Sequence, residues 1–118
     1  MNTEISFGFK LILKGSDNEP FFGPGVATLL RAIDQTGNVK EAAASMGLSY
    51  TKAWTMLRNT KKGIGTDAVL SSKGGVNGGK AELTEAGREL LMRYEEFESR
   101  SGMLLNYAFK GCFNEDQA

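Results

Sequence analysis

Residues 38–62 read NVKEAAASMGLSYTKAWTMLRNTKK, a pattern that predicts two helices joined by a very short turn. Asn38 is a preferred N-terminal cap, and Glu41 three residues later can complete a capping box. The helix that follows is short and rich in alanine, so another helix can approach it closely, and it ends at Gly47. Ser49 can cap a second helix only two residues after that glycine. Two helices joined by so tight a turn must cross steeply, as they do in a helix-turn-helix.

The second helix of this unit, from Tyr50 to about Lys62, has two chemically different faces. Its apolar stripe, which we expect to face the core, consists of Tyr50, Ala53, Trp54 and Leu57. Its start and opposite face offer polar and basic groups that suit the major groove of DNA: Ser49, Tyr50, Thr51, Lys52, Thr55, Arg58, Asn59 and Lys62. Trp54 and Tyr50 could instead form a stacking platform for single-stranded bases, but aromatic residues at helical spacing more often pack in a core.

The segment before the helix-turn-helix predicts a strand followed by another helix. Apolar residues alternate with other residues from Ile5 to Leu13, which is typical of a strand with one buried face. Turn residues 15–18 follow, and residues 20–22 can return briefly as a second strand. A helix then begins near Pro24 and ends near Gly37, because glycine can adopt the left-handed conformation that terminates helices.

The segment after the helix-turn-helix, residues 68–83, predicts a β-hairpin, or wing, with a flexible, glycine-rich and basic tip. The residues of this tip that we expect to contact the DNA backbone or the minor groove are Lys73, Asn77 and Lys80. A phosphate-binding P-loop is the rival interpretation. It is disfavoured because the required glycine, lysine and serine or threonine pattern is absent, as is a preceding buried strand.

The last helix is predicted over residues 84–109, with Thr84 as its cap. It has apolar residues spaced by threes and fours, which can form an internal core or the contact surface for a partner. A helix of this length offers more apolar surface than a small helical unit covers, so we favour dimerisation. The residues expected in the dimer contact are Leu90, Tyr94, Phe97 and Leu104.

The composition excludes most enzyme mechanisms. The chain has no histidine and a single cysteine, Cys112, so it lacks the usual nucleophile pairs, a disulfide and the common zinc ligands. We therefore expect no enzymatic activity, no cofactor and no metal. No apolar run is long enough to span a membrane and no secretory signal is evident, so we expect a cytoplasmic, nucleoid-associated protein without a membrane partner.

Charge is distributed unevenly along a chain whose formal net charge is zero. Residues 49–80 contain six basic side chains and one acid, whereas residues 82–98 contain six glutamates and two arginines. A basic segment that coincides with the helix-turn-helix and the wing favours nucleic acid as the partner.

Together these elements predict a mainly α protein with a small β component, an α+β winged helix-turn-helix. The predicted single domain covers residues 1–113, with the helix-turn-helix at 38–62, the wing at 68–83, the C-terminal helix at 84–109 and a polar tail at 114–118. The predicted function is sequence-specific binding of double-stranded DNA by a homodimeric transcriptional regulator. The alternative is a winged-helix module that binds another protein and does not bind DNA specifically.

The sequence also resembles a known family over about residues 5–94. The residues that carry the resemblance are Phe22-Gly23-Pro24-Gly25, Leu29-Leu30, Ala32-Ile33, Thr36-Gly37-Asn38-Val39, Ala42-Ala43, Met46-Gly47, Ser49-Tyr50, Ala53-Trp54, Gly74-Gly75, Gly78-Gly79 and Leu83-Thr84-Glu85-Ala86-Gly87. They resemble the N-terminal DNA-binding domain of molybdate-responsive ModE-type regulators of bacteria, whose helix-turn-helix is similar to that of LysR-type regulators. The resemblance implies a homodimer that acts as a repressor or an activator.

Two departures from the family pattern limit what the resemblance implies. Family members commonly continue into molybdate-binding domains, for which this chain has no length after its last helix, so molybdate is not expected on this chain. Residues 58–63 are more basic than the family pattern and lack its usual acidic residue, which allows a different target sequence.

Overall fold

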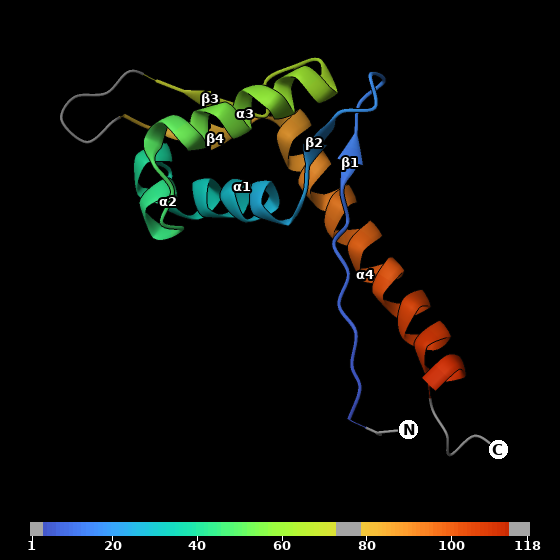
Figure 1. Ribbon diagram of the computed structural model, residues 1–118. Helices are drawn as coiled ribbons and strands as arrows, with labels where there is room; N and C mark the ends of the chain where they lie inside the picture. Colours follow the sequence, from blue (N-terminus) through green and yellow to red (C-terminus); the bar gives the residue numbers. More distant parts are fainter. Residues whose placement is uncertain (1–3, 73–78, 114–118) are drawn as a thin grey trace.

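The computed structural model describes residues 4–72 and 79–113, and it shows a helical head from which one long helix projects (Figure 1). The helices are α1 (Pro24–Thr36), α2 (Val39–Ser45), α3 (Tyr50–Ile64) and α4 (Glu85–Phe113). The strands form two antiparallel pairs, β1 (Leu13–Lys14) with β2 (Pro20–Phe22) and β3 (Val69–Ser71) with β4 (Ala81–Leu83). This is the mainly α winged helix-turn-helix that the sequence predicted.

Helix α1 forms the centre of the head. Pro24 occupies its first turn, where the missing N–H costs nothing, and Gly37 ends it in the left-handed conformation with φ 69°. Its inward face is fully buried at Ala27, Leu29, Leu30 and Ile33. Helix α2 packs closely against α1 because its inward positions, which include Ala42 and Ala43, are small.

The turn between α2 and α3 has the caps that the sequence predicted. The Asn38 Oδ1 accepts a hydrogen bond from the amide of Glu41 at 2.9 Å, and the Ser49 Oγ accepts one from the amide of Lys52 at 3.0 Å. Gly47 takes the left-handed conformation with φ 68°. Because each cap is satisfied within its own helix start, the two helices begin at fixed residues on either side of the short turn.

Helix α3 is longer than predicted, because it continues through Gly63 and ends at Gly65, whose φ is 81°. Gly63 lies directly under the ring of Phe21, and a Cβ at this position would lie 2.2 Å from the ring's Cγ. Strand β2 therefore packs onto the last turn of α3 through this glycine. The sequence shows two glycines here, and the contact with Phe21 decides which of them ends the helix.

The predicted N-terminal strand is wrong over most of its length. Only Leu13 and Lys14 pair with β2, and the chain before them runs extended alongside the C-terminal half of α4 (Figure 1). The Phe7 ring lies 4.9 Å from that of Phe109. Ile5, Phe7 and Phe9 remain 40–43% exposed. Their alternation suits a buried sheet face, but a single helix covers only one side of the segment and supplies no strand partner.

The base of the wing is the predicted hairpin. Val69 pairs with Leu83 and Ser71 pairs with Ala81, and the inward residues Val69, Ala81 and Leu83 are buried. Lys73 and Asn77, which we predicted at the tip, lie outside the described residues, as does the predicted tail at 114–118. The described part of the wing is thus an antiparallel strand pair whose inward side chains are anchored in the core.

Helix α4 begins where the wing ends. The Thr84 Oγ1 accepts a hydrogen bond from the amide of Gly87 at 2.9 Å and donates one to the carbonyl of Asp67 at 2.7 Å, so it ties the cap of α4 to the start of the wing. A Cβ at Gly87 would lie 2.1 Å from the Ala68 carbonyl oxygen. This close approach requires glycine and sets the angle at which α4 leaves the head.

Tyr94 fixes the first half of α4 to the core. Its side chain is 1% exposed, its ring stands edge-on to Phe22 with centroids 5.0 Å apart, and its hydroxyl donates to the carbonyl of Leu11 at 2.9 Å. Two ion pairs on the surface join α1 to α4: Arg31 to Glu95 at 2.7 Å and Arg88 to Asp34 at 3.0 Å. Through the Tyr94 ring and hydroxyl, the N-terminal segment and β2 are both packed against α4.

Candidate nucleic-acid interface

Helix α3 presents a polar and cationic face away from the core. Its inward side is buried at Ala53, Leu57 and Thr60, which places the opposite side in solvent. The residues exposed on that side are Thr51, Lys52, Arg58, Asn59 and Lys62, with Thr55 half-buried between them. The whole helix has four basic residues and no acidic one. Such a face attracts an anion and meets no opposing charge from its own helix.

Arg58 is held in place on this face by its neighbours. The Thr55 Oγ1 donates to the carbonyl of Thr51 at 3.0 Å and accepts from the Arg58 Nη2 at 3.1 Å. The guanidinium is thereby tied to the second turn of the helix, while its remaining N–H groups stay available to a ligand. A planar, partly immobilised fork of donors suits the bidentate recognition of guanine or phosphate.

The start of α3 differs from the prediction at Tyr50. This residue is 47% exposed and therefore is not part of the core stripe, whereas Trp54 is half-buried and packs against the core. The two rings meet edge to face, with centroids 6.2 Å apart and planes inclined by 80°. A stacking platform needs accessible parallel faces, so this pair does not form one for single-stranded bases. The Ser49 hydroxyl oxygen is occupied by the helix cap, but its O–H is left for another acceptor.

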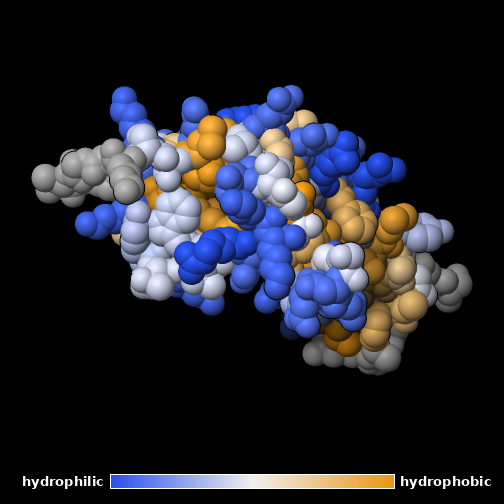
Figure 2. Space-filling model, turned by 90° about the horizontal axis from the view of Figure 1, so that it is seen from above, coloured by the Kyte–Doolittle hydropathy of each residue, from blue (hydrophilic) through white to orange (hydrophobic). Residues whose placement is uncertain are grey.

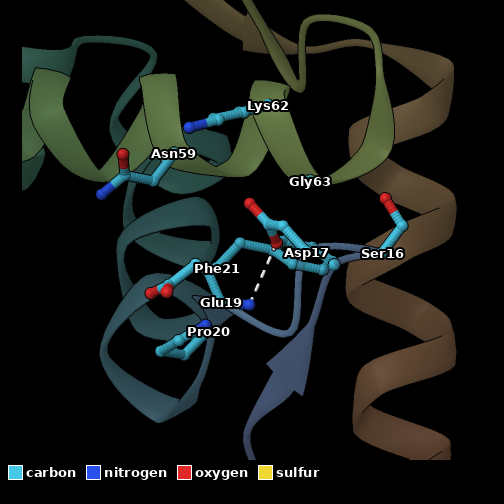
Figure 3. A pocket seen from close by; sticks show the side chains of 9 residues that line it. Ser16, Asp17, Glu19, Pro20, Phe21, Asn59, Lys62 and Gly63 are labelled. Atoms are coloured by element: carbon cyan, nitrogen blue, oxygen red, sulfur yellow. Dashed lines mark hydrogen bonds between the residues drawn. The ribbon is translucent and has the colours of Figure 1, made fainter.

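Asn59 and Lys62 lie near the other end of α3, beside a hollow of about 370 Å³ (Figure 3). The hollow separates α3 from the turn between β1 and β2, which contributes Ser16, Asp17 and Glu19 to its walls. The Asp17 Oδ1 accepts a hydrogen bond from the Glu19 amide at 3.0 Å, which closes the turn. Two carboxylates near Lys62 weaken its attraction for phosphate, so the first turns of α3 are better suited to DNA than the last.

Lys80 lies on the anchored base of the wing and not on a flexible tip. Its carbonyl accepts a hydrogen bond from the amide of Ser72 at 2.9 Å, and the next residue, Ala81, donates to the carbonyl of Gly37 at 2.8 Å. The carbonyl of the preceding residue, Gly79, accepts from the Asn38 Nδ2 at 2.9 Å. The backbone on both sides of Lys80 is fixed, while its side chain is exposed. Sequence reasoning missed these contacts, because it assigned Asn38 only the role of a helix cap.

The four residues predicted for dimerisation fall into two groups. Leu90 is half-buried against the core and Tyr94 is buried within it, so Tyr94 is a core residue of its own chain, contrary to the prediction. Phe97 and Leu104 are 51% and 72% exposed. Figure 2 shows hydrophobic side chains gathered at the end of the molecule where α4 and the N-terminal segment run together. We call this surface the apolar arm: Ile5, Phe7, Phe9, Phe97, Met103, Leu104, Tyr107 and Phe113.

Other kinds of site are not supported by the described residues. Within residues 4–72 and 79–113, no three histidine, cysteine or acidic side chains lie close enough together to hold a metal ion. Cys112 is an exposed free thiol. None of the helices in the described part of the chain is both long and apolar enough to cross a membrane.

No family model matches the chain, but individual relatives do. The chain is 37% identical over 90 residues to a molybdenum-pterin-binding protein, MopB, of Rhodobacter capsulatus, an alignment that covers 76% of this chain and 33% of the relative. It is 33% identical over 97 residues to the transcriptional regulator ModE of Haemophilus influenzae, covering 82% of this chain and 36% of that protein. The chain is similar to ModE-type regulators, as its motifs predicted. It spans about a third of the length of these two relatives, neither of which is named as an enzyme.

Solved structures resemble the chain in fold. The DNA-binding domain of CbnR in complex with DNA superposes with a TM-score of 0.54 at 24% identity, covering 71% of this chain and 94% of that domain. CbnR is a regulator of the LysR family. The likeness shows that this chain shares its winged helix-turn-helix fold with LysR-type DNA-binding domains.

Proposed function

We propose that the protein is a homodimeric transcriptional regulator that binds a specific double-stranded DNA sequence, with α3 in the major groove and the wing on the backbone or in the minor groove. The observation that carries the proposal is the outer face of α3, which is exposed, cationic and free of acidic residues on a winged helix-turn-helix fold. Relatives named as transcriptional regulators and a similar domain solved on DNA support it. Such a regulator would act in the cytoplasm at the nucleoid.

Base reading is assigned to the first turns of α3. Thr51, Lys52, Thr55 and Arg58 share this part of the helix, and Arg58 is already oriented by Thr55. A bidentate contact of this kind discriminates between bases by about 1–3 kcal/mol. Arg58 and Lys52 therefore have the best geometry for specificity. Ser49, Tyr50, Asn59 and Lys62 lie before and after them and would contact the phosphates or neighbouring bases.

The wing is assigned to the DNA backbone. Lys80 is an exposed point charge on a fixed backbone, and one flexible ammonium group attracts phosphate without distinguishing one base from another. Lys73, outside the described residues, is proposed to act in the same way, and Asn77, also outside them, is proposed to donate a neutral amide hydrogen bond to the backbone or the minor groove.

The proposed dimer forms through the apolar arm, with a second copy of the chain as the partner. Phe97 and Leu104 expose most of their side chains on a helix that has no covering neighbour on that side within the described residues. Apolar surface of this extent on a long helix is typical of a subunit contact. A symmetric pair would place two copies of α3 on the same side of the duplex, as in proteins that bind palindromic sites.

Selection of bound sequences from a random pool of duplex DNA tests the proposal directly. One enriched motif with two-fold symmetry is the expected result. Arg58→Ala should then weaken binding to that motif far more than binding to random duplex, because it removes a base contact. Lys80→Ala should weaken both alike. In a dimer it should also reduce the slope of log affinity against log salt concentration by about 1.8, since each phosphate contact occurs twice and contributes about 0.9.

The alternative function is a winged-helix module that binds another protein through the apolar arm and does not bind DNA specifically. It predicts no enriched motif, and affinity for duplex DNA that hardly changes between two salt concentrations. If wing variants changed the ratio of specific to random affinity while α3 variants left it untouched, the roles given to the two elements would be reversed.

A further inference from the structure

The junction between α1 and α2 is hydrogen-bonded to the first residue of β4 and to the chain just before it. The Gly37 carbonyl accepts from the amide of Ala81 at 2.8 Å, and the Asn38 Nδ2 donates to the carbonyl of Gly79 at 2.9 Å. On its other edge the same stretch pairs with β3, where the Ser72 amide donates to the Lys80 carbonyl at 2.9 Å. The short segment that includes Lys80 is therefore held from both sides.

The Asn38 side chain performs two tasks at once. Its Oδ1 caps α2 by accepting from the Glu41 amide, and its Nδ2 reaches Gly79, which is 41 residues away in the sequence. The residue is only 7% exposed. A side-chain amide has both an acceptor and a donor, whereas serine offers the cap with a shorter hydroxyl and aspartate offers the cap with no donor. Capping α2 alone would thus not require asparagine.

We propose that Asn38 is a positioning residue that fixes Lys80 and the wing relative to α3. Its Oδ1 accepts a hydrogen bond from the start of α2, which is joined to α3 by a tight turn, and its Nδ2 donates one to the wing. One planar amide group therefore helps to set the distance between the wing and α3. This inference rests on the proposed function, in which both elements contact the same duplex. A wing that is already oriented loses less conformational freedom on binding than a wing that must be ordered by the DNA.

Asn38→Ser is the variant that separates the two tasks. Serine is a good helix cap, so α2 keeps its start, but its hydroxyl is too short to replace the bond to Gly79. Asn38→Asp is less suitable, because it adds a negative charge near the proposed DNA contact. Ala44→Gly is the matched control, since it weakens α2 at an exposed position that makes no hydrogen bond to the described part of the wing.

Amide hydrogen exchange tests the geometry without DNA. In Asn38→Ser the amides of Ala81 and Ser72 should exchange about tenfold faster, because the hydrogen-bonded stretch around Lys80 opens more often, while the Glu41 amide keeps its protection. Ala44→Gly should show the opposite pattern, with faster exchange in α2 and an unchanged wing. Unchanged exchange at Ala81 and Ser72 in Asn38→Ser would overturn the inference, whatever the protein binds.

DNA binding tests the consequence. Asn38→Ser should lower the logarithm of the affinity for random duplex DNA by at least half as much as Lys80→Ala does. It should also make this affinity fall less steeply as the salt concentration rises. In the Lys80→Ala background, Asn38→Ser should change the affinity by less than about twofold, since the two changes remove the same contact. If Lys80→Ala weakens binding and Asn38→Ser does not, the inference fails while the proposed function stands. If the unchanged chain shows no salt-dependent binding, the proposed function fails and the exchange at Ala81 still decides the geometry.

Discussion

Helix α4 passes through two regions in which its side chains are buried to very different extents. In the head, Gly87, Leu91 and Tyr94 are buried against α1, β2 and the base of the wing. Along the apolar arm, the described residues of the helix from 95 to 113 include no buried side chain, and Tyr107 is 83% exposed. One continuous helix thus supplies part of a core at one end and an uncovered apolar surface at the other.

The comparison shows that apolar spacing along a helix does not say what the apolar face contacts. Both halves of α4 carry aromatic and aliphatic residues at intervals of three and four. The first half packs against helices and strands of the head and is buried there, whereas the second half meets, among the described residues, only the extended N-terminal segment on one side and has no buried side chain. The second half is available for a second subunit, which is the reason for proposing the dimer contact there.

The two tyrosines of α4 give the sharpest test of this difference. Tyr94→Ala should lower the free energy of unfolding by about 3–5 kcal/mol, because it leaves a cavity beside Phe22 and removes the hydrogen bond to Leu11. Tyr107→Ala, at a concentration where the chain is monomeric, should change it by less than about 1 kcal/mol. Urea unfolding followed by circular dichroism measures both. Equal losses would mean that the apolar arm is packed as tightly as the head.

Two glycines of α4 form a second matched pair, because substitution by alanine should destabilise the protein at one and stabilise it at the other. Gly87→Ala places a Cβ against the Ala68 carbonyl, which is backbone and cannot move aside, so we expect a loss of about 1–3 kcal/mol in unfolding free energy. At Gly111 no side chain or other element among residues 4–72 and 79–113 lies within 4 Å of the position that a Cβ would take, so Gly111→Ala should stabilise the helix by about 0.5–1 kcal/mol. Thermal unfolding of the two variants should therefore shift in opposite directions.

The buried hydroxyl of Tyr94 should make the head sensitive to alkali. Burial raises the pKa of the Tyr94 phenol. The folded state therefore holds this proton more tightly than the unfolded state, and the resulting stability is present below the unfolded pKa of about 10 and is lost as the pH rises through the folded pKa. Tyr94→Phe should cost about 1 kcal/mol at neutral pH through the lost hydrogen bond and should flatten the stability curve above a pH of about 10. A curve as steep as that of the unchanged chain would assign the alkaline sensitivity to other groups.

Changes on the apolar arm should alter association and leave the head intact. Phe97→Glu combined with Leu104→Glu should convert a dimer into a monomer at tens of micromolar, while the unfolding free energy of the monomer changes by less than about 0.5 kcal/mol. Asn106→Glu adds a charge on the opposite side of the helix and serves as the control. Sedimentation velocity measures the outcome. A monomeric unchanged chain at this concentration would contradict the proposed dimer contact.

The sequence by itself determined the elements that depend on near neighbours in the chain. The starts of α2 and α3 follow from Asn38 and Ser49, because a capping side chain bonds to an amide only three residues away. The end of α1 at Gly37 and the outer face of α3 follow for the same reason, since left-handed glycines and helical faces are local properties. The fold and the proposed base-reading face of the candidate site could therefore be predicted.

Only the tertiary structure decided the features that depend on distant partners. The segment from Ile5 to Phe9 has the pattern of a strand but lies beside α4, where it has no strand to pair with. Gly63 continues α3 because Phe21 packs on it, and Tyr94 belongs to the core because Phe22 and Leu11 meet it there. The bond from Asn38 to Gly79 joins residues 41 positions apart. Periodicity and capping report interactions within a few residues, whereas burial and long-range hydrogen bonds depend on which surfaces the folded chain brings together.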